Sequence, residues 1–371
     1  MNKTFVLYVP GSSLSEFHLR SPWIELPMAF HHLGFNSLLI CGKYNLKDNG
    51  NFQVTETFVR GRNFVKSVFE PFFAFKEIMI KKPDLVMISP FGSYLISIIP
   101  LLIITRTLFG NKKTRFWLKT DWNIDFTGMS RIVRLLTSVL FSISSHLFDF
   151  TTLETKCGVE QAKRQFFANS DKINRFPIGF PQDFMKINTY NNQRRKKVIL
   201  CVARIARMKD QLTLIKAFDE ALKTYGDWKL ILAGPIDEAD YMEELLIETN
   251  NFGTREQVTF TGFIDEEELL ELYGTSSIFC LPSRYKENAG QVKYEAISAG
   301  LPVISTDVPC REENENMGIL VFKAGDVQGL LKILLTLMEG DRIREQISKN
   351  AQSKLLSYTD NVKEFLKFYK L

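Results

Sequence analysis

The stretch from Cys280 to Thr306, CLPSRYKENAGQVKYEAISAGLPVIST, constrains the fold more than any other part of the chain. It reads as a short apolar strand, a polar loop at residues 283–289, a helix that begins near Gly290 and a second strand after Gly300. Glycine at position 300 suits the left-handed residue that commonly ends a helix. A strand, a helix and another strand in succession form a βαβ unit, which predicts a parallel sheet covered by helices.

Two carboxylates belong to this unit, Glu287 in the loop and Glu295 on the helix. The neighbours of Glu295 on the helix, Val292 and Ala296, are apolar, which predicts that Glu295 lies near a buried edge; the alternative is a solvated helix residue. The unpaired N–H groups that open the helix at Gly290 favour an anion. Because carboxylates accept hydrogen bonds from sugar hydroxyls, this combination indicates a nucleotide-sugar site.

The same alternation of strands and helices runs through both halves of the chain. In the first half we expect strands at residues 5–9, 36–41, 54–59, 84–89, 114–118 and 150–153, and a second series starts at residue 198. Each series predicts a doubly wound parallel sheet, and 371 residues suffice for two such domains. The segment from Pro10 to Ser13 follows the first strand, where either a plain turn or a weak phosphate-binding loop is expected.

The expected domain boundaries follow from this series and from a polar linker. We expect a first domain at residues 1–181, a linker at 182–197 that ends in the basic run RRKK, and a second domain at 198–354. A C-terminal helix at about residues 355–371 is expected to pack back on the first domain.

The charge of the chain is uneven. Residues 1–180 hold 22 Lys and Arg against 13 Asp and Glu, a net charge of +9, whereas the remainder holds 25 against 29, a net charge of −4. A basic first half favours an anionic partner such as phosphates, a membrane surface or nucleic acid. Alternatively, the charges are scattered over a solvated surface.

Two apolar helices in the first half also have alternative interpretations. The one expected at residues 94–109 is mostly Leu and Ile, but it is shorter than the ~20 residues that a bilayer span needs. The one expected at residues 131–150 has Ser and Thr on much of one face. Packing inside the domain is the default expectation for both, and contact with a membrane surface is the alternative. The apolar stripe of the second helix, expected to be core, comprises Ile132, Leu135, Leu136, Val139, Leu140, Ile143 and Leu147.

Two motifs in the second half resemble those of family 4 (group 1) glycosyltransferases. Residues 287–295, ENAGQVKYE, match the E-x7-E motif of that family. Residues 202–204, Val-Ala-Arg, are followed by Lys209, where the family usually has Gly-Arg and then Lys-Gly. This chain retains Arg204 and Lys209 but has Ala203 and Asp210 at the glycine positions. The resemblance is dense over residues 198–337 and looser over residues 1–180.

The resemblance implies a GT-B architecture, in which two Rossmann-like doubly wound parallel-sheet domains face each other across a cleft. It also implies that Glu287 accepts hydroxyls of the donor sugar and Glu295 accepts ribose hydroxyls. Arg204 and Lys209 would hold the diphosphate and stabilise the leaving nucleoside diphosphate. The backbone of Asn288, Ala289, Gly290 and Gln291 would line the sugar and phosphate.

Weaker matches extend this expected site. Gly234 ends a strand, and Phe263 and Ile264 lie in a region that borders the nucleobase in the family, although structural turns explain both equally well. Many relatives carry a His where this chain has Lys119 and Asp121. Asp121 is expected to contact sugar or acceptor, Lys119 a phosphate, and Gly11 the donor from the loop after the first strand.

We therefore expect a retaining, metal-independent glycosyltransferase of the hexosyltransferase type. The nucleotide sugar is a substrate and no cofactor or metal is expected, since no DxD motif stands at a strand end. The acceptor is expected to be a glycan, with a lipid-linked or membrane-proximal glycan as one option. We expect no nucleic-acid partner and a cytoplasmic location, with peripheral contact at the inner face of the plasma membrane as an option. The alternatives are a nucleotide-sugar epimerase of the same fold and a non-catalytic GT-B binding subunit.

Overall fold

The computed structural model divides the chain into two compact units, residues 1–179 with 357–371 (unit 1) and residues 180–356 (unit 2). The division falls beside the expected boundary at residue 181, and the C-terminal segment groups with unit 1. The structure describes residues 3–14, 21–46, 52–57, 63–89, 94–108, 113–120, 130–165, 167–180, 195–285, 290–308 and 310–371.

Unit 1 contains a parallel sheet in the order β3-β2-β1-β4-β5-β6-β7. Because the order reverses at β1, the sheet is doubly wound, as the alternation of strands and helices predicted. The last strand was not expected, because its segment is short and lies beside a turn-rich stretch. The strands are β1 (Thr4–Leu14), β2 (Asn36–Tyr44), β3 (Gln53–Glu56), β4 (Leu85–Ile88), β5 (Arg115–Lys119), β6 (Phe150–Leu153) and β7 (Ile173–Arg175).

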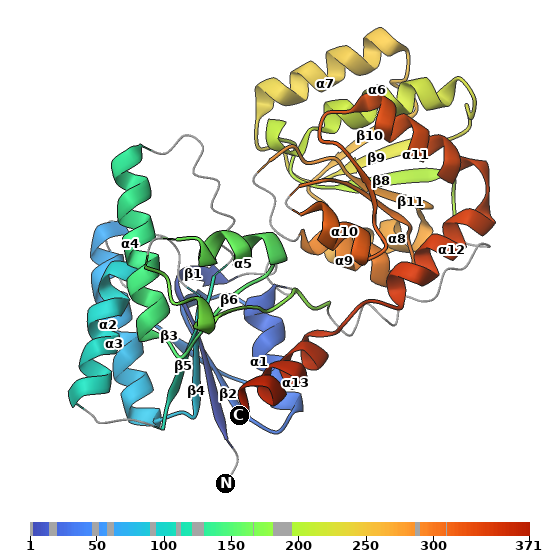
Figure 1. Ribbon diagram of the computed structural model, residues 1–371. Helices are drawn as coiled ribbons and strands as arrows, with labels where there is room; N and C mark the ends of the chain where they lie inside the picture. The colour runs from blue at the N-terminus through green and yellow to red at the C-terminus, as the bar shows by residue number, and fades with distance from the viewer. Residues whose placement is uncertain are drawn as a thin grey trace. The chain divides into compact units, whose positions relative to one another are not determined.

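Helices cover both faces of this sheet (Figure 1). Alternation along β1 explains how: Val6 and Tyr8 join the core cluster beneath α2 and α3, whereas the ring of Phe5 stacks on Phe30 of α1 with centroids 3.7 Å apart. The helices are α1 (Pro22–His32), α2 (Asn63–Lys81), α3 (Tyr94–Leu108), α4 (Arg131–Leu147), α5 (Lys156–Lys163) and α13 (Tyr358–Tyr369).

The first strand continues past the turn expected at residues 10–13. Its register with β2 shifts between Val9 and Ser13, after which Ser13 pairs with Lys43. Gly11 has a φ of +71°, so the segment forms a bulge inside a longer strand. The expected turn is therefore wrong, because pairing with β2 keeps the chain in the sheet as far as Leu14.

A buried carboxylate holds this bulge. Glu70 of α2 is 2% exposed, and its Oε1 accepts the N–H of Gly11 at 2.8 Å and the hydroxyl of Thr57 at 3.4 Å. Its Oε2 accepts the hydroxyl of Tyr94 at 3.4 Å. Burial raises the pKa of Glu70 above its ordinary value, because the charged form loses water, and these hydrogen bonds oppose the rise only in part.

The C-terminal helix α13 packs on the face of the sheet that α1 covers. The ring of Phe365 stacks on Trp117 of β5 with centroids 4.0 Å apart, and Tyr369 accepts a hydrogen bond from Asn174 of β7 at 2.8 Å. Residues far apart in the sequence thus complete unit 1, since Asn174 and Tyr369 are 195 positions apart.

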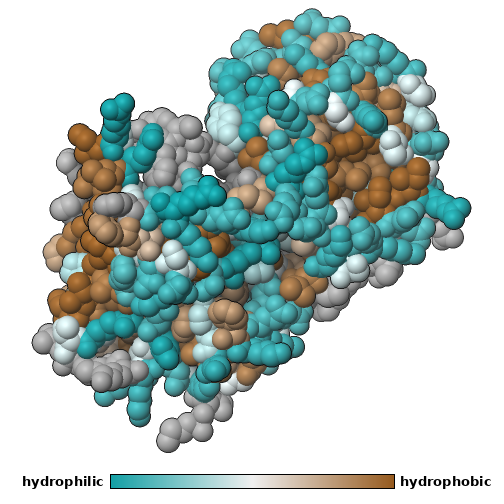
Figure 2. All heavy atoms as spheres, in the orientation of Figure 1, coloured by the Kyte–Doolittle hydropathy of each residue, from teal (hydrophilic) through white to brown (hydrophobic). Residues whose placement is uncertain are grey.

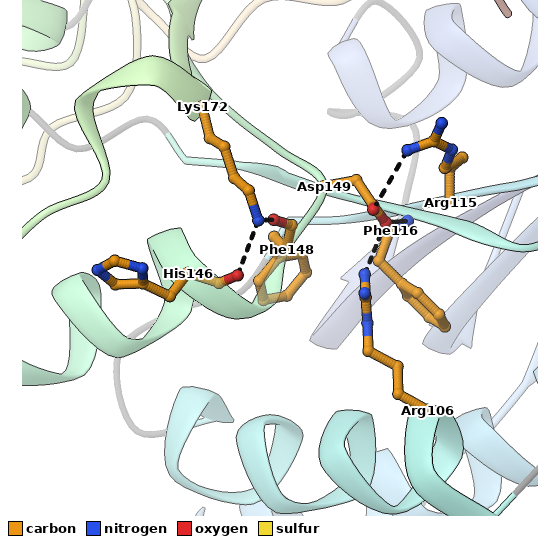
Figure 3. A network of polar contacts seen from close by, with 7 residues as sticks. All are labelled: Arg106, Arg115, Phe116, His146, Phe148, Asp149 and Lys172. Atoms are coloured by element: carbon orange, nitrogen blue, oxygen red, sulfur yellow. Dashed lines mark hydrogen bonds and ion pairs between the residues drawn. The ribbon is translucent and has the colours of Figure 1, made fainter. Parts of the chain in front are cut away.

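One polar network fixes the end of α4 against the sheet (Figure 3). Lys172 donates from Nζ to the carbonyl oxygens of His146 and Phe148, each at 2.8 Å, which places a cation on the last turn of the helix. The carboxylate of Asp149 accepts the Phe116 N–H at 2.8 Å and the Arg106 guanidinium at 2.6 Å. Asp149 therefore ties α3 to β5, and Lys172, which precedes β7, holds the last turn of α4.

Unit 2 repeats the doubly wound plan with a sheet in the order β10-β9-β8-β11-β12-β13. Its helices α6, α7 and α11 lie on one face and α8, α9, α10 and α12 on the other (Figure 1). The strands are β8 (Val198–Val202), β9 (Lys229–Ala233), β10 (Val258–Gly262), β11 (Ile278–Leu281), β12 (Val303–Thr306) and β13 (Leu320–Phe322). The helices are α6 (Gln211–Leu222), α7 (Ala239–Phe252), α8 (Glu266–Thr275), α9 (Gln291–Ser298), α10 (Arg311–Asn316), α11 (Val327–Glu339) and α12 (Asp341–Gln352).

The raised pKa of Glu70 makes the stability of unit 1 depend on pH. In the native state Glu70 binds a proton more tightly than in the unfolded chain, so ionisation at neutral pH costs folding free energy, and that cost disappears as pH falls through the native pKa. For Glu70→Gln, we expect the unfolding free energy relative to wild type to decline steadily from pH 7 to about pH 4.5. Urea unfolding followed by circular dichroism at several pH values measures this difference, and a constant difference would contradict the assignment.

Candidate active site

The sheet order of unit 2 creates a switch point between β8 and β11. The strands β8 and β9 pair in parallel on one side, and β8 and β11 pair in parallel on the other. The connections that leave β8 and β11 therefore start at the same carboxyl edge and turn to opposite faces of the sheet. In open parallel sheets, ligands bind in the crevice at such a point.

The connection after β8 carries the two expected phosphate-binding cations. Arg204 is exposed and its guanidinium forms an ion pair with Asp237, which follows β9. Lys209 is half-buried and ends the short 3-10 helix Arg207–Lys209. The side chain of Arg207 forms ion pairs with Asp240 and with a second carboxylate on α7, and these ion pairs hold the 3-10 helix against α7.

Asp210 explains how this loop keeps its shape without the glycine that the family pattern has after the lysine. Its backbone is left-handed, with φ +51° and ψ +42°, a conformation that favours glycine and that Asp tolerates better than most residues. The side chain is buried and its Oδ2 accepts the hydroxyl of Thr213 at 2.6 Å and Nε of Arg284 at 2.7 Å. These bonds offset the backbone cost.

Arg284 joins the two connections at the switch point. Its side chain binds Asp210 of the first connection, and its backbone N–H donates to the carbonyl oxygen of Met208 at 2.9 Å. The preceding residue, Ser283, is fixed by the end of β12, because its carbonyl oxygen accepts a hydrogen bond from the hydroxyl of Thr306 at 2.7 Å. Sequence reasoning missed both Asp210 and Arg284 as positioning residues; the only signal was an acidic residue where glycine is usual.

The helix α9 carries Glu295 beneath this edge. Gly290 precedes the helix with φ +72° and ψ +76°, and Gln291 is the first helical residue. Glu295 is buried, as its apolar neighbours predicted, and its Oε2 accepts the hydroxyl of Tyr273 at 3.0 Å. This bond fixes the orientation of the carboxylate. The predicted residues Glu287, Asn288 and Ala289 lie outside the described part of the chain.

The strand ends next to β8 pack tightly through Gly234. A Cβ at this position would lie 2.2 Å from the carbonyl oxygen of Ala203, so only glycine allows the two loops to approach. Backbone hydrogen bonds continue the contact, from Ala203 to Ala233 and from Gly234 to Gly262. Phe263, next along the chain, is 60% exposed at the same edge, and Ile264 is half-buried.

The predicted residues of unit 1 have other partners in the structure. The N–H of Gly11 donates to Glu70, so in this conformation it is not directed at a phosphate. Lys119 is buried and its Nζ donates to the carboxylate of Glu154 at 2.8 Å. Asp121 lies outside the described residues.

The described part of unit 2 thus brings cations, a fixed carboxylate and a helix N-terminus to one sheet edge. Such a set can bind a phosphate-bearing ligand that also offers hydroxyl groups. Among the described residues, no group of three or more His, Cys, Asp or Glu side chains is arranged to hold a metal ion.

The comparisons with known proteins agree with this geometry. A family model described as glycosyl transferases group 1 matches residues 185–354. This segment is a group 1 glycosyltransferase domain. It contains the whole switch point and both connections that form the candidate site.

Curated relatives of this glycosyltransferase domain align over part of their length. An uncharacterised glycosyltransferase of Methanocaldococcus jannaschii is 36% identical over 116 residues, which are 31% of this chain and 28% of the relative. A sulfoquinovosyl transferase of Arabidopsis thaliana is 28% identical over 185 residues, 48% of this chain and 34% of the relative. The chain therefore spans about a third of the length of these relatives.

Solved structures extend the likeness to both units at the level of fold. The HepE protein of Anabaena, solved with UDP and glucose, has a TM-score of 0.76 and 15% identity over 98% of this chain and 99% of its own. The catalytic domain of starch synthase IV from Arabidopsis thaliana, bound to ADP and acarbose, has a TM-score of 0.73 and 12% identity over 100% and 99%. The predicted GT-B fold, two Rossmann-like parallel-sheet domains, is confirmed.

The left-handed Asp210 gives a test of how the first connection is held. We expect Asp210→Ala to destabilise unit 2 by about 2 kcal/mol, because it loses both side-chain bonds and keeps an unfavourable φ. Asp210→Gly should cost only about 1 kcal/mol, since glycine removes the backbone strain but not the loss of the bonds. Equal losses of unfolding free energy in urea would show that the backbone conformation has no part in the effect.

Proposed function

We propose that the protein is a retaining glycosyltransferase that transfers a sugar from a nucleotide-sugar donor bound by unit 2. The observation that carries the proposal is the joining of the connections after β8 and β11 by Asp210 and Arg284. This joining presents Arg204 and Lys209 at the edge below which Glu295 is fixed. UDP in the neighbouring HepE structure supports a nucleoside diphosphate as the donor's leaving group.

In the proposed reaction, the cations act on the leaving group. Charge builds on the nucleoside diphosphate as the glycosidic bond to phosphate breaks, and Arg204 and Lys209 would stabilise it without a metal. Arg204 would exchange its exposed partner Asp237 for the diphosphate, a change of low cost because exposed ion pairs contribute little. The backbone N–H groups at the start of α9 would add donors toward the phosphates.

The two carboxylates would bind hydroxyls rather than exchange protons. Glu295 has one oxygen fixed by Tyr273, and a carboxylate has further acceptor capacity for the ribose hydroxyls. Glu287 would accept hydroxyls of the transferred hexose. With no general base assigned, the acceptor attacks from the face that the diphosphate leaves, and a phosphate oxygen takes the acceptor proton, which retains the anomeric configuration.

The residues of unit 1 would serve the acceptor. We propose that Asp121 contacts the acceptor or the transferred sugar. The buried ion pair with Glu154 gives Lys119 a different place, in which it orients the end of β5 instead of contacting a phosphate directly. A lipid-linked or membrane-proximal glycan is the acceptor class that we propose, and its support is the exposed apolar surface of unit 1.

Donor binding can be measured without knowing the acceptor. We expect UDP, tested beside ADP and GDP, to raise the thermal unfolding midpoint, and a nucleotide at 100 times its Kd to stabilise by about 2.7 kcal/mol. Lys209→Ala should abolish most of this shift, because it removes a diphosphate cation. The matched control Lys332→Ala, exposed on α11, should leave the shift intact. A full shift in Lys209→Ala would contradict the site.

Turnover tests the carboxylate that lies outside the described residues. Glu287→Ala should lower transfer from the accepted nucleotide sugar by at least about a hundredfold, since it removes hydroxyl contacts made to the reacting sugar. Product analysis by mass spectrometry and NMR gives the rate and the anomeric outcome. Unchanged turnover would overturn the role of Glu287. Conversion of the donor to an epimer without an acceptor would identify an epimerase instead.

A further inference from the structure

The helix α4 is amphipathic, but much of its apolar side is exposed and its serine-rich side is buried. Most of its apolar stripe, which the sequence pattern predicted to be core, faces solvent: Ile132 is 71% exposed, Leu135 61% and Leu136 58%. Leu147, the last residue of the stripe, is half-buried against the core of unit 1. The expectation that this stripe is core is therefore wrong for its exposed members. The side that packs on unit 1 carries Phe141 together with three serines, Ser142, Ser144 and Ser145.

The buried serines can pack inward because their hydroxyl groups are satisfied within the helix. Ser142 donates to the carbonyl oxygen of Ser138, and Ser144 donates to that of Leu140, each at 2.8 Å. Ser145 donates to the carbonyl oxygen of Ser142 at 2.7 Å. A small side chain whose donor is already used costs little to bury. The serines of α4 are thus buried in unit 1, and most of its apolar stripe is exposed.

The exposed stripe continues across the two neighbouring helices. The helix α3 packs against both α2 and α4. Each presents large apolar side chains to solvent, and a band of hydrophobic surface lies over these helices (Figure 2). A contiguous apolar surface of this kind marks an interaction site in a soluble domain. The exposed side chains on α2 and α3 include Phe69, Phe72, Phe73, Ile96, Ile103 and Ile104.

The fully exposed charges on this face are positive. Arg131 and Arg134 are exposed at the start of α4, and Lys76 is exposed among the phenylalanines of α2. Neither α3 nor α4 contains Asp or Glu, and on α2 Glu70 is buried and Glu77 half-buried. The face therefore complements a partner that is apolar inside and negatively charged at its surface.

We propose that this face, formed by α2, α3 and α4, docks on the interface of an anionic lipid bilayer. Apolar side chains would enter the headgroup region while the arginines and lysine meet the anionic headgroups. None of the helices in the described ranges is long and apolar enough to cross a membrane, so the helices lie on the bilayer. Lys172 and Asp149 anchor the last turn of α4, which keeps its exposed first half in place.

A second copy of the chain fits this face less well. In a two-fold contact the same surface meets itself, so its cations would face cations. In the described residues of the three helices, Glu77 is the one half-exposed carboxylate that could pair with them. An anionic bilayer provides the missing charge.

Vesicle flotation with the full chain tests the proposal. Wild type should float with phosphatidylcholine vesicles that contain phosphatidylglycerol, and much less with phosphatidylcholine alone or at high salt. Ile132→Ser/Leu135→Ser and, separately, Arg131→Gln/Arg134→Gln should each weaken binding by about tenfold or more. The matched controls Ile247→Ser/Phe368→Ser and Lys332→Gln/Lys354→Gln change exposed residues elsewhere and should bind as wild type does.

The outcomes distinguish the docking surface from donor binding. The role of the docking surface in supplying the acceptor rests on the proposed function. Every variant should keep its circular dichroism spectrum and its thermal shift with nucleotide, because the substituted side chains are exposed and none of them is a proposed donor-binding residue. Wild type that fails to float, or an apolar variant that floats fully, overturns the docking surface and leaves donor binding untouched. A wild-type dimer in sedimentation equilibrium that Ile132→Ser/Leu135→Ser dissociates, without vesicle binding, would assign the face to a second copy.

Discussion

The ion pair between Asp210 and Arg284 is the contact on which the candidate site depends. The order of parallel strands places the connections after β8 and β11 at one edge, but strand order alone leaves their tips unconnected. Asp210 takes a left-handed backbone conformation, and its buried carboxylate binds the guanidinium of the other connection at 2.7 Å. A loop pattern that usually relies on glycine is thereby replaced by one that relies on a side-chain bond.

Unit 1 uses buried polar groups differently. Glu70 holds the bulge at Gly11, Lys119 pairs with Glu154, and the serines of α4 bond within their own helix. Each arrangement satisfies a polar group inside the domain and so limits its desolvation cost. The consequence at the surface is unusual, because three serines of α4 are buried beside Phe141 while most of its apolar stripe is exposed.

Much of the architecture could be predicted because its signals are local. Continuous apolar runs marked most strands, and glycines or prolines marked the ends, so both doubly wound sheets were expected. The β-strand at Ile173–Arg175 and the helix at Lys156–Lys163 were missed, since both are short and neither has a strong periodic pattern. The bulge at Gly11 was mistaken for a turn because glycine is typical of both, and only pairing with β2 distinguishes them.

The sequence by itself determined the fold class, the order of the elements and the identity of Arg204, Lys209 and Glu295 as candidate ligands of a nucleotide sugar. The fold class and element order followed from periodicity, which is a property of neighbouring residues, and the three candidate ligands followed from the resemblance of their motifs to those of family 4 glycosyltransferases. The tertiary structure alone decided which residue pairs meet and which side of an amphipathic helix is buried. Asp210 and Arg284 lie 74 positions apart, and the buried side of α4 is the one on which Phe141 and three serines fit against the rest of unit 1, so neither follows from local pattern.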